Sequence, residues 1–283
     1  MTAPRWFCHR LAGERRLGVA QGDSYFDLGP QDEGVLLRSG GLDAAAVEHL
    51  CAVGRPMGQP VFDVPVAQPS KILCLGKNFA AHAAEFGAQV PEESIIFAKL
   101  ADTLLAHGQP VLLPRWVETR IDHEIELGVI LGFCDPERKG RKYVPAAEAL
   151  QLVAGYTVLN DVTARKMQGT DRDKKHPWLR SKSFDTFCPL GPWVVAREHL
   201  PNVGDLALRL SVNGVVRQQS RTSLMVVSIA QAIEFLSQHT TLRPGDLIAM
   251  GTPEGVGPLQ DGDMMVGEIE GIGQLVNPVL REP

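Results

Sequence analysis

The sequence predicts a β-rich α+β fold, with a small N-terminal unit over residues 1–65 and a large unit over residues 66–283. Most of the chain consists of short apolar or β-branched segments bounded by glycine and proline, which is typical of strands joined by turns. Only a few segments show the spacing of an amphipathic helix. A proline-rich passage separates the two units, and its prolines are Pro56, Pro60, Pro65 and Pro69.

The composition argues against several classes of protein. The 283 residues are 44% hydrophobic and carry a formal charge of −5, so the chain can bury a large core and lacks the positive charge of a nucleic-acid-binding protein. No apolar run approaches the roughly 20 residues that span a bilayer, and the N-terminus lacks the pattern of a secretory signal. Five scattered cysteines without a Cys-x-x-Cys pair are typical of reduced thiols. We therefore expect a cytoplasmic protein that binds neither nucleic acid nor membrane.

The N-terminal unit contains no cluster of acids, histidines or glycines that would support chemistry. Strands are predicted over residues 6–9, 17–20 and 25–28. A helix is predicted over residues 43–53, with Asp43 as its N-cap, because an aspartate side chain accepts a hydrogen bond from the free N–H groups of the first turn. We interpret this unit as a structural cap or as a support for a dimer.

The most informative stretch of the large unit is residues 122–132, in which aliphatic side chains recur at every second position, as in a strand. Glu124 and Glu126 therefore leave from the face opposite the aliphatic side chains, roughly 6–7 Å apart at Cα. Two neighbouring carboxylates repel each other unless a cation lies between them, and a hard divalent cation suits oxygen ligands best. An exposed strand end with solvated acids is the alternative interpretation.

A short helix is predicted to begin at Phe79 and to end before Gly87, with Asn78 as its N-cap. His82 and Glu85 are three residues apart and therefore share one face of this helix. A carboxylate beside an imidazole selects one tautomer and raises the basicity of the ring, which suits a general base for water. An ordinary surface pair is the alternative.

The remaining elements of the large unit are mostly strands. Strands are predicted over residues 71–75, 95–99, 109–113, 155–162, 189–195, 206–212, 215–219 and 247–250, and helices over residues 145–150 and 226–238. Asn213 and Gly214 predict a type I′ hairpin turn, since both residues tolerate positive φ. One strand ends in Asp161, whose charge needs a partner if it is buried. Residues 168–180 are basic and show no periodicity, so we predict a mobile loop there.

The remaining glycine-rich and serine motifs do not support nucleotide binding or the chemistry of a serine hydrolase. The loop over residues 251–257 lacks the Gly-Lys-Ser/Thr ending of a phosphate-binding loop, and residues 267–273 lack the helix that follows a dinucleotide fingerprint. No Gly-x-Ser-x-Gly elbow is present. His123 is adjacent to Glu124, so its side chain should point to the opposite face, and we assign it no role.

Six motifs occur in one order along the large unit. They are Gly-Lys-Asn-Phe-Ala-Ala-His-Ala-Ala-Glu, Asp-His-Glu-Ile-Glu-Leu-Gly-Val, Gly-Tyr-Thr-Val-Leu-Asn-Asp-Val-Thr-Ala-Arg, Lys-Ser-Phe-Asp-Thr-Phe-Cys-Pro-Leu-Gly-Pro, Val-Asn-Gly and Gly-Thr-Pro-Glu-Gly-Val-Gly. Together they resemble the fumarylacetoacetate hydrolase family, in particular its acylpyruvases and 2-hydroxyhepta-2,4-diene-1,7-dioate isomerases, over about residues 70–277. The resemblance implies a mixed β-sandwich or roll of the family's C-terminal type, a small N-terminal α+β domain, and a homodimer.

The resemblance also implies the residues of the site. It implies that a divalent ion, Mg²⁺, Mn²⁺ or Ca²⁺, is held by three carboxylate ligands, Glu124, Glu126 and Asp161. It implies a catalytic group on a lid helix and beside the metal, consisting of His82, Glu85 and Lys182. The substrate-binding residues that it implies are Lys77, Gln168 and Thr252. Phe79 and His123 both stand where relatives often carry tyrosine, which leaves the metal ligands intact and affects only the substrate.

Through this resemblance we expect a metal-dependent hydrolase that cleaves a C–C bond of a 2,4-dioxo acid of the acylpyruvate or fumarylpyruvate type. The expected route is a metal-stabilised enolate, with His82 and Glu85 activating water. An oxaloacetate-type decarboxylase or a 2-hydroxymuconate-type isomerase would use the same metal site. A non-catalytic binding protein with a structural ion is a further alternative, although such a protein needs no His-x-x-Glu helix, lysine and Gly-Thr-Pro loop together.

Overall fold

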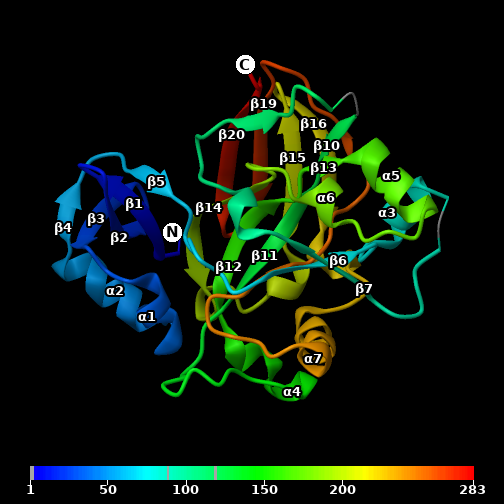
Figure 1. Cartoon of the computed structure of the whole chain (residues 1–283). Coiled ribbons are helices and arrows are strands. Elements are labelled where there is room, and N and C mark those ends of the chain that lie inside the picture. The colour runs from blue at the N-terminus through cyan, green and yellow to red at the C-terminus, as the bar shows by residue number, and fades with distance from the viewer. Residues whose placement is uncertain (1–2, 88, 118–119) are drawn as a thin grey trace.

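The computed structural model describes residues 3–87, 89–117 and 120–283 of the chain. Its largest sheet crosses the whole molecule, from the small N-terminal unit into the large unit (Figure 1). In the order of pairing, its main path is β4 (Arg55–Met57), β3 (Ser24–Gly29), β2 (Glu14–Gln21), β1 (Arg5–Leu11), β14 (Cys188–Ala196), β12 (Val153–Asn160), β11 (Ile125–Leu131), β17 (Leu247–Ala249), β6 (Ile72–Gly76) and β7 (Ile95–Lys99). Two short strands lie off this path, β5 (Val61–Asp63) beside β1 and β8 (Leu104–Leu105) beside β14.

Two smaller sheets complete the strand framework. One has the order β16 (Val215–Arg221), β15 (Ala207–Val212), β19 (Met264–Ile269), β20 (Gly273–Arg281) and β9 (Val111–Leu113), and the other β13 (Thr163–Ala164), β10 (Ile121–His123) and β18 (Gly257–Pro258). The helices are α1 (Glu33–Arg38), α2 (Ala44–Val53), α3 (Ala80–Glu85), α4 (Ala146–Ala149), α5 (Arg165–Asp173), α6 (Leu179–Lys182) and α7 (Ile229–His239), and the 3₁₀ turns η1 (Ala101–Thr103), η2 (Leu150–Leu152), η3 (Arg197–His199), η4 (Val203–Asp205) and η5 (Thr222–Leu224). The predicted β-rich α+β fold is confirmed.

Among the described residues, no helix is both long and apolar enough to cross a membrane.

The N-terminal unit forms the predicted three strands, with α1 and α2 packed beside them (Figure 1). Asp43 caps α2 as predicted, because its side chain accepts a hydrogen bond of 2.7 Å from the backbone N–H of Ala46. The sequence does not predict helix α1. Strand β1 pairs with β14, which places Trp6 opposite Val194 and makes one sheet continuous between the two units. The boundary after residue 65 remains a prediction.

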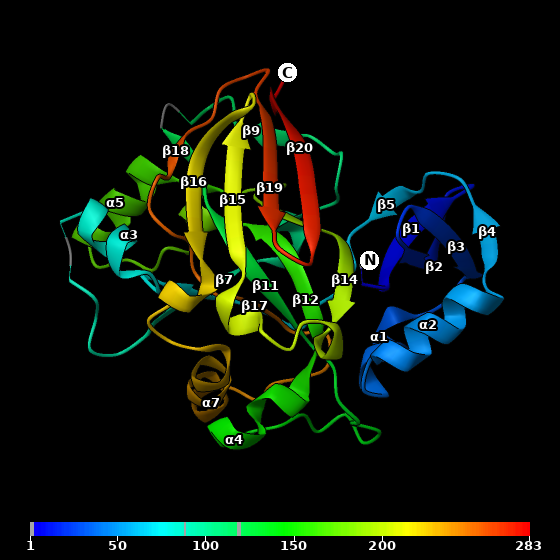
Figure 2. The ribbon, with the colours of Figure 1, turned by 180° about the vertical axis from the view of Figure 1, so that it is seen from behind.

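Strand β11 lies between two buried apolar clusters. Ile125, Leu127 and Val129 belong to the cluster that the five-stranded sheet covers, whereas Ile130 belongs to the cluster on the opposite side (Figure 2). Gly267 on β19 allows the close approach of the two sheets, since a Cβ there would lie 3.2 Å from Ile125 Cδ1. The predicted alternation along β11 therefore holds. The packing of its apolar side chains in a large core fixes which side each face of the strand points to.

The stretch predicted as one strand over residues 122–132 is in fact two strands that belong to different sheets. β10 ends at His123 and β11 begins at Ile125, so Glu124 lies at the junction. The Glu124 N–H donates to the Asn160 side chain at 2.8 Å instead of to a ladder partner. Sequence period alone does not reveal this break, because Asn160 comes from the neighbouring strand.

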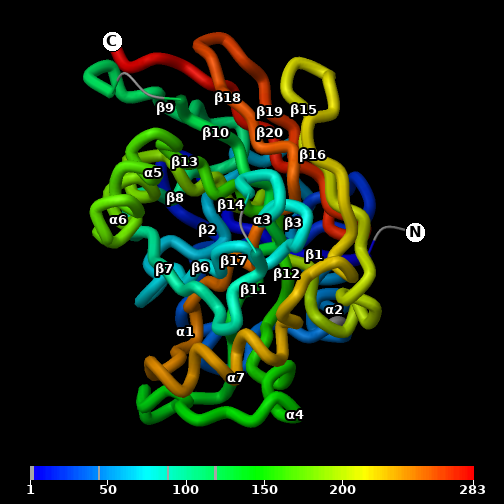
Figure 3. The backbone as a smooth tube through the Cα atoms, turned by 90° about the vertical axis from the view of Figure 1, so that its right-hand side faces the viewer, coloured from blue at the N-terminus to red at the C-terminus, as the bar shows by residue number. Residues whose placement is uncertain are grey.

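The mobile loop predicted over residues 168–180 is wrong, since helices α5 and α6 occupy most of it. The buried side of this segment is charged and therefore shows no apolar period. Asp171 is fully buried, and it accepts hydrogen bonds from Arg180 at 2.9 and 2.5 Å. Figure 3 shows α5 beside β10 and β13, at the end of the large unit where α3 also lies.

Asn78 is not the N-cap of α3, although the helix itself forms close to the predicted residues. Phe79 occupies the cap position without a side-chain hydrogen bond. The Asn78 amide is buried and bridges the Met250 and Val227 carbonyls at 2.8 and 3.1 Å, which ties the loop before α3 to β17 and to the start of α7. Elsewhere Asn213 (φ 52°) and Gly214 (φ 78°) form the predicted hairpin turn.

Candidate metal centre and active site

Three buried carboxylates converge where two neighbouring central strands of the main sheet, β11 and β12, have their adjacent ends. Glu124 follows β10, Glu126 lies on β11, and Asp161 follows β12, which pairs with β11 so that Ile125 is opposite Asn160. A hydrogen bond of 2.8 Å from the Asp161 N–H to the Glu124 carbonyl holds the two ends together. One oxygen of each carboxylate lies within 4.8 Å of the others, and all three residues are at most 3% exposed.

Three cations surround two of these carboxylates. Lys182 Nζ, at the end of α6, lies 2.9 Å from Glu124 Oε2 and 2.5 Å from Asp161 Oδ2. Arg165, the first residue of α5, pairs with the other oxygen of Glu124 and with Asp122 at 2.8 Å. Lys99 Nζ, at the end of β7, lies 2.7 Å from Asp161 Oδ1.

These cations change the protonation of the site. Burial alone would raise the pKa of Glu124, but Lys182 and Arg165 outweigh burial and lower it below its usual range. Burial would likewise lower the pKa of Lys182, and Asp161 and Glu124 outweigh it and raise that pKa. Both charges are therefore kept inside the protein.

Glu126 differs from its two neighbours. Among the described residues its carboxylate has no cation partner, and the Gly251 N–H donates to it at 2.6 Å. Burial, followed by the charges of Asp161 and Glu124, raises the pKa of Glu126 well above its usual value. The cations Lys99, Lys182 and Arg165 therefore contact Glu124 and Asp161, and none of the three contacts Glu126.

The residues present fit a divalent metal ion. The donor set is entirely oxygen, which suits Mg²⁺, Mn²⁺ or Ca²⁺ better than zinc. The uncompensated Glu126 carboxylate is the position at which an added positive charge would be most favourable, because an unpaired buried charge is costly. The donor atoms are also close enough for one ion to contact all three.

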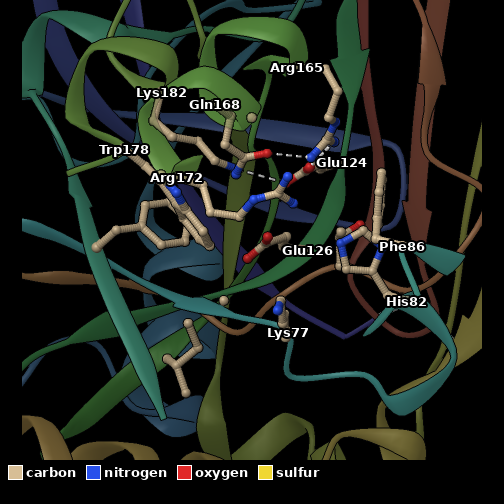
Figure 4. A pocket seen from close by; sticks show the side chains of 15 residues that line it. Lys77, His82, Phe86, Glu124, Glu126, Arg165, Gln168, Arg172, Trp178 and Lys182 are labelled. Atoms are coloured by element: carbon tan, nitrogen blue, oxygen red, sulfur yellow. Dashed lines mark hydrogen bonds and ion pairs between the residues drawn. The ribbon is translucent and has the colours of Figure 1, made fainter. Parts of the chain in front are cut away.

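A cavity of about 230 Å³ opens above the carboxylates. In Figure 4 the labelled side chains surround Glu126, with Lys77 below it, His82 and Phe86 on one side, and Trp178 on the other. Its apolar wall consists of Leu75, Phe86, Phe97 and Trp178. The Phe97 and Trp178 rings meet edge to face at 5.6 Å, so this wall is closely packed.

His82 and Glu85 form the predicted pair on α3. His82 Nδ1 lies 3.2 Å from Glu85 Oε2, and Glu85 Oε1 accepts a hydrogen bond of 3.2 Å from the Gly255 N–H. His82 is 8% exposed and lines the cavity. Because Glu85 faces Nδ1, the ring nitrogen Nε2 is the one without a hydrogen-bond partner among the described residues.

The three predicted substrate-binding residues all line this cavity. Lys77 has a φ of 57°, a left-handed conformation that costs a non-glycine residue about 1–2 kcal/mol and that often occurs at functional sites. Arg165 donates to Gln168 Oε1 at 2.7 Å, so the Gln168 amide nitrogen takes no part in this contact. Thr252 Oγ1 accepts a hydrogen bond of 2.8 Å from Gln218.

Sequence reasoning misses several residues around the site. Gln218 also accepts from His123 Nδ1 at 3.0 Å, so His123, to which the sequence assigns no role, is linked to Thr252 through one amide. The sequence identifies Lys99 only as the end of a strand, and Arg165 only as the end of a motif. The sequence gives no signal for either residue, because each pairs with an acid that is distant in the chain. The acid that pairs with Lys99 lies 62 residues away, and the acid that pairs with Arg165 lies 41 residues away.

The fold and the site together define a β-rich α+β protein whose buried carboxylate cluster can hold a divalent metal ion at the floor of a small-molecule cavity. The chain belongs to the fumarylacetoacetate (FAA) hydrolase C-terminal family, which it matches over residues 71–280.

Known relatives catalyse several different reactions. The chain is 39% identical over 232 residues to the mitochondrial oxaloacetate tautomerase FAHD2A of Bos taurus, covering 80% of this chain and 71% of the relative. It is similar in structure to a 5-carboxymethyl-2-hydroxymuconate delta-isomerase from Mycobacterium smegmatis, with 34% identity, 99% of each chain covered and a TM-score of 0.76. It is also similar to a fumarylpyruvate hydrolase from Pseudomonas aeruginosa in complex with Mn²⁺ and pyruvate, with 35% identity, 80% and 93% coverage and a TM-score of 0.69.

Proposed function

We propose that this protein is a divalent-metal-dependent hydrolase that cleaves a C–C bond in a 2,4-dioxo acid of the acylpyruvate or fumarylpyruvate type. The observation that carries the proposal is the His82–Glu85 pair, whose histidine lines the same cavity as Glu124 and Glu126. A metal-assisted proton transfer needs a base within reach of the bound substrate, and the buried His82, held by Glu85, is suited to that task. The similarity to a fumarylpyruvate hydrolase that binds Mn²⁺ and pyruvate supports the same reaction class.

The three carboxylates would hold Mg²⁺ or Mn²⁺, and the bound ion would supply Lewis-acid chemistry at the 2-oxo acid end of the substrate. Lys182 and Lys99 hold the Asp161 carboxylate, so the ligands are in place before the substrate enters. The Gln168 amide and the Thr252 hydroxyl both line the cavity and would donate to substrate oxygens. These contacts orient the substrate and need no rearrangement of the sheet.

His82 would act as the general base through Nε2, while Glu85 keeps the other ring nitrogen protonated. Nε2 takes a proton from water, and the water oxygen forms a bond with the C4 carbonyl carbon. The bond between C3 and C4 then breaks, its electron pair stays on C3, and the acyl part leaves as a carboxylic acid. A proton delivered to C3 completes pyruvate, so the net reaction consumes one water.

A second candidate is proton transfer or decarboxylation on oxaloacetate, which the similarity to an oxaloacetate tautomerase favours. The same pair could move a proton between carbon and oxygen without adding water. The similarity to a delta-isomerase supports a proton shift along a dienol as a further reaction of the same site.

The test is a panel of acetylpyruvate, fumarylpyruvate and oxaloacetate, each with Mg²⁺ and with Mn²⁺. Hydrolysis gives pyruvate and a second acid without CO₂, decarboxylation gives equal amounts of pyruvate and CO₂, and isomerisation gives a spectral shift with no loss of carbon. Replacing His82 by Ala should abolish hydrolysis, whereas replacing the exposed His49 of α2 by Gln should leave it unchanged. Full hydrolysis by His82→Ala would contradict the proposed base. The predicted homodimer is tested separately by light scattering.

A further inference from the structure

The cations around the cavity differ in whether carboxylates of the protein already neutralise their charge. Lys182 is 2% exposed in its side chain and is paired with two carboxylates. Arg165 is 15% exposed in its side chain, and all its guanidinium nitrogens donate, to Asp122, to Gln168 and to Glu124. The charges of these two cations are therefore already compensated by carboxylates of the protein.

Two further cations line the cavity without a buried partner. Lys77 is half-buried and has no hydrogen bond or ion pair among the described residues. Arg172 has a side chain that is 61% exposed, and its only ion-pair partner in the described part of the chain is Asp173, whose own side chain is 70% exposed. Such a solvent-exposed pair contributes little energy, so a ligand carboxylate can replace it at small cost.

The position of Arg172 on α5 follows from helix periodicity. Arg165, Gln168, Gly169 and Arg172 all line the cavity, and their spacing of three, four and seven residues puts them on one face of the helix. The seven residues from Arg165 to Arg172 span roughly 10 Å along the axis. In Figure 4 the Arg172 side chain extends over the cavity between Trp178 and Arg165, away from the α5 backbone.

The cavity therefore has a cationic opening, an aromatic apolar middle and a carboxylate floor that would hold a metal ion. Phe97 and Trp178 form the middle, and Gly76 allows Trp178 to pack closely, because a Cβ there would lie 3.2 Å from the indole. A ligand that satisfies all three zones has a 2-oxo acid group at one end, a short apolar linker, and a second negative charge at the other end. Guanidinium groups bind carboxylates in a bidentate geometry that an ammonium cannot reproduce.

We propose that Arg172, assisted by Lys77, binds the distal carboxylate of the ligand, so that the site selects dicarboxylic 2-oxo acids over monocarboxylic ones of the same length. The reaction part of this inference rests on the proposed function, but the binding part does not. Arg172 is then a specificity-determining residue at the opening, distinct from the residues that would act on the reacting carbons.

The first experiment measures binding and requires no turnover. Calorimetry with the Mn²⁺-loaded protein compares 2-oxoglutarate with 2-oxopentanoate, and 2-oxoadipate with 2-oxohexanoate, at low salt. The wild-type protein should bind at least one dicarboxylate about five- to tenfold more tightly than its matched monocarboxylate. In Arg172→Met this ratio should fall to about one, and in Arg172→Lys it should take an intermediate value.

Lys174→Met is the matched control, since Lys174 is exposed, directly follows α5 and does not line the cavity. It removes one positive charge from the same region and should keep the wild-type ratio. A wild-type ratio of about one, an unchanged ratio in Arg172→Met, or an equal loss in the control would each overturn the proposal. Thermal unfolding of every variant confirms that the fold is retained.

A kinetic experiment separates this inference from the proposed function. If the protein hydrolyses 2,4-dioxo acids, Arg172→Met should raise the KM for fumarylpyruvate about five- to tenfold and change that for acetylpyruvate by less than about twofold. Arg172-dependent binding of dicarboxylates without any hydrolysis would contradict the proposed reaction and leave the inference standing. Hydrolysis without any preference for dicarboxylates, in binding or in KM, would support the proposed reaction and overturn this inference.

Discussion

Lys99 Nζ lies 2.7 Å from Asp161 Oδ1, and neither side chain is exposed to solvent. Lys99 also donates to the Val162 carbonyl at 3.2 Å, so it supports both the carboxylate and the turn that carries it. It does not line the cavity, which means that it acts on a ligand only through Asp161. The carboxylate is held on one oxygen by Lys99 and on the other by Lys182, so its orientation does not depend on a bound ion.

This relationship predicts a large loss of stability when Lys99 is replaced by Met. Breaking a buried ion pair by removing one partner typically costs about 3–5 kcal/mol, because the remaining charge is left without compensation. Urea unfolding in the presence of chelator should show this loss, and saturating Mn²⁺ should recover part of it. Lys139→Met is the control, since its pair with Glu137 is exposed and is worth at most about 1 kcal/mol. Equal losses in the two variants would argue against a supporting role for Lys99.

Replacing Glu126 by Gln should weaken metal binding while leaving the metal-free fold intact. Glu126 has no cation partner among the described residues, so the substitution removes charge repulsion and leaves no lysine unpaired. The amide side chain of the variant keeps an oxygen that can accept from the Gly251 N–H. We expect Mn²⁺ affinity to fall at least about tenfold, which corresponds to about 1.4 kcal/mol, together with any metal-dependent activity.

The matched variant is Glu124→Gln, which leaves Lys182 and Arg165 without their shared carboxylate. It should lower the free energy of unfolding of the metal-free protein, whereas Glu126→Gln should not. Calorimetry with Mn²⁺ and urea unfolding in chelator measure the two effects. Equal destabilisation of the metal-free protein by both variants would contradict the conclusion that cations compensate the charge of Glu124 and not that of Glu126.

The five cysteines should differ sharply in reactivity. Burial raises the pKa of Cys8 and Cys188 to about 12 and also raises that of Cys51 and Cys74, whereas Cys134 is the exposed cysteine. Because the thiolate is the reactive form, a thiol reagent at about pH 8 should modify one cysteine quickly in the native protein and all of them after unfolding. Cys134→Ser should abolish the fast phase. More than one fast thiol would show that the buried cysteines are accessible.

Asp27 in the N-terminal unit should make the free energy of unfolding fall at acidic pH. Hydrogen bonds from Arg16 at 3.0 and 2.8 Å, which outweigh burial, lower the pKa of Asp27 below its usual range of about 4. A lowered folded-state pKa stabilises the protein above the unfolded-state pKa, and this contribution is lost as the pH falls from about 4. The stability difference between the wild-type protein and Asp27→Asn should therefore be largest near neutral pH and should shrink below about pH 4.

Urea unfolding between about pH 7 and about pH 3 measures this difference. Asp102→Asn is the control, because Asp102 is exposed and has no hydrogen bond or ion pair among the described residues. A difference that grew as the pH fell would contradict the predicted sign.

Much of the site could be predicted from the sequence, since its acids occupy positions where local pattern is informative. The period of two places Glu124 and Glu126 on one side of a strand, and in the structure their carboxylates converge. The spacing of His82 and Glu85 likewise predicts a pair, and the two side chains lie 3.2 Å apart. Local spacing succeeds here because neighbours in a strand or helix are also neighbours in space.

Other features could not be predicted because their partners are distant in the chain. Helix α5 escapes prediction since its buried side chain is the charged Asp171, which leaves no apolar period. Asn78 has the sequence position of an N-cap, yet its amide bonds to Met250, 172 residues away. The break at Glu124 depends on the Asn160 side chain of the adjacent strand.

By itself, the sequence determined the β-rich class, the turns, the order of the family motifs and the acids that face one way. Only the tertiary structure decided which cations compensate which acids, with Lys99 and Lys182 on Asp161 and, among the described residues, no cation on Glu126. It also decided that Arg172 stands at the opening of the cavity with its charge available. The reason is physical, since charge compensation depends on distance and burial, and both are set by the packing of segments that lie far apart in the sequence.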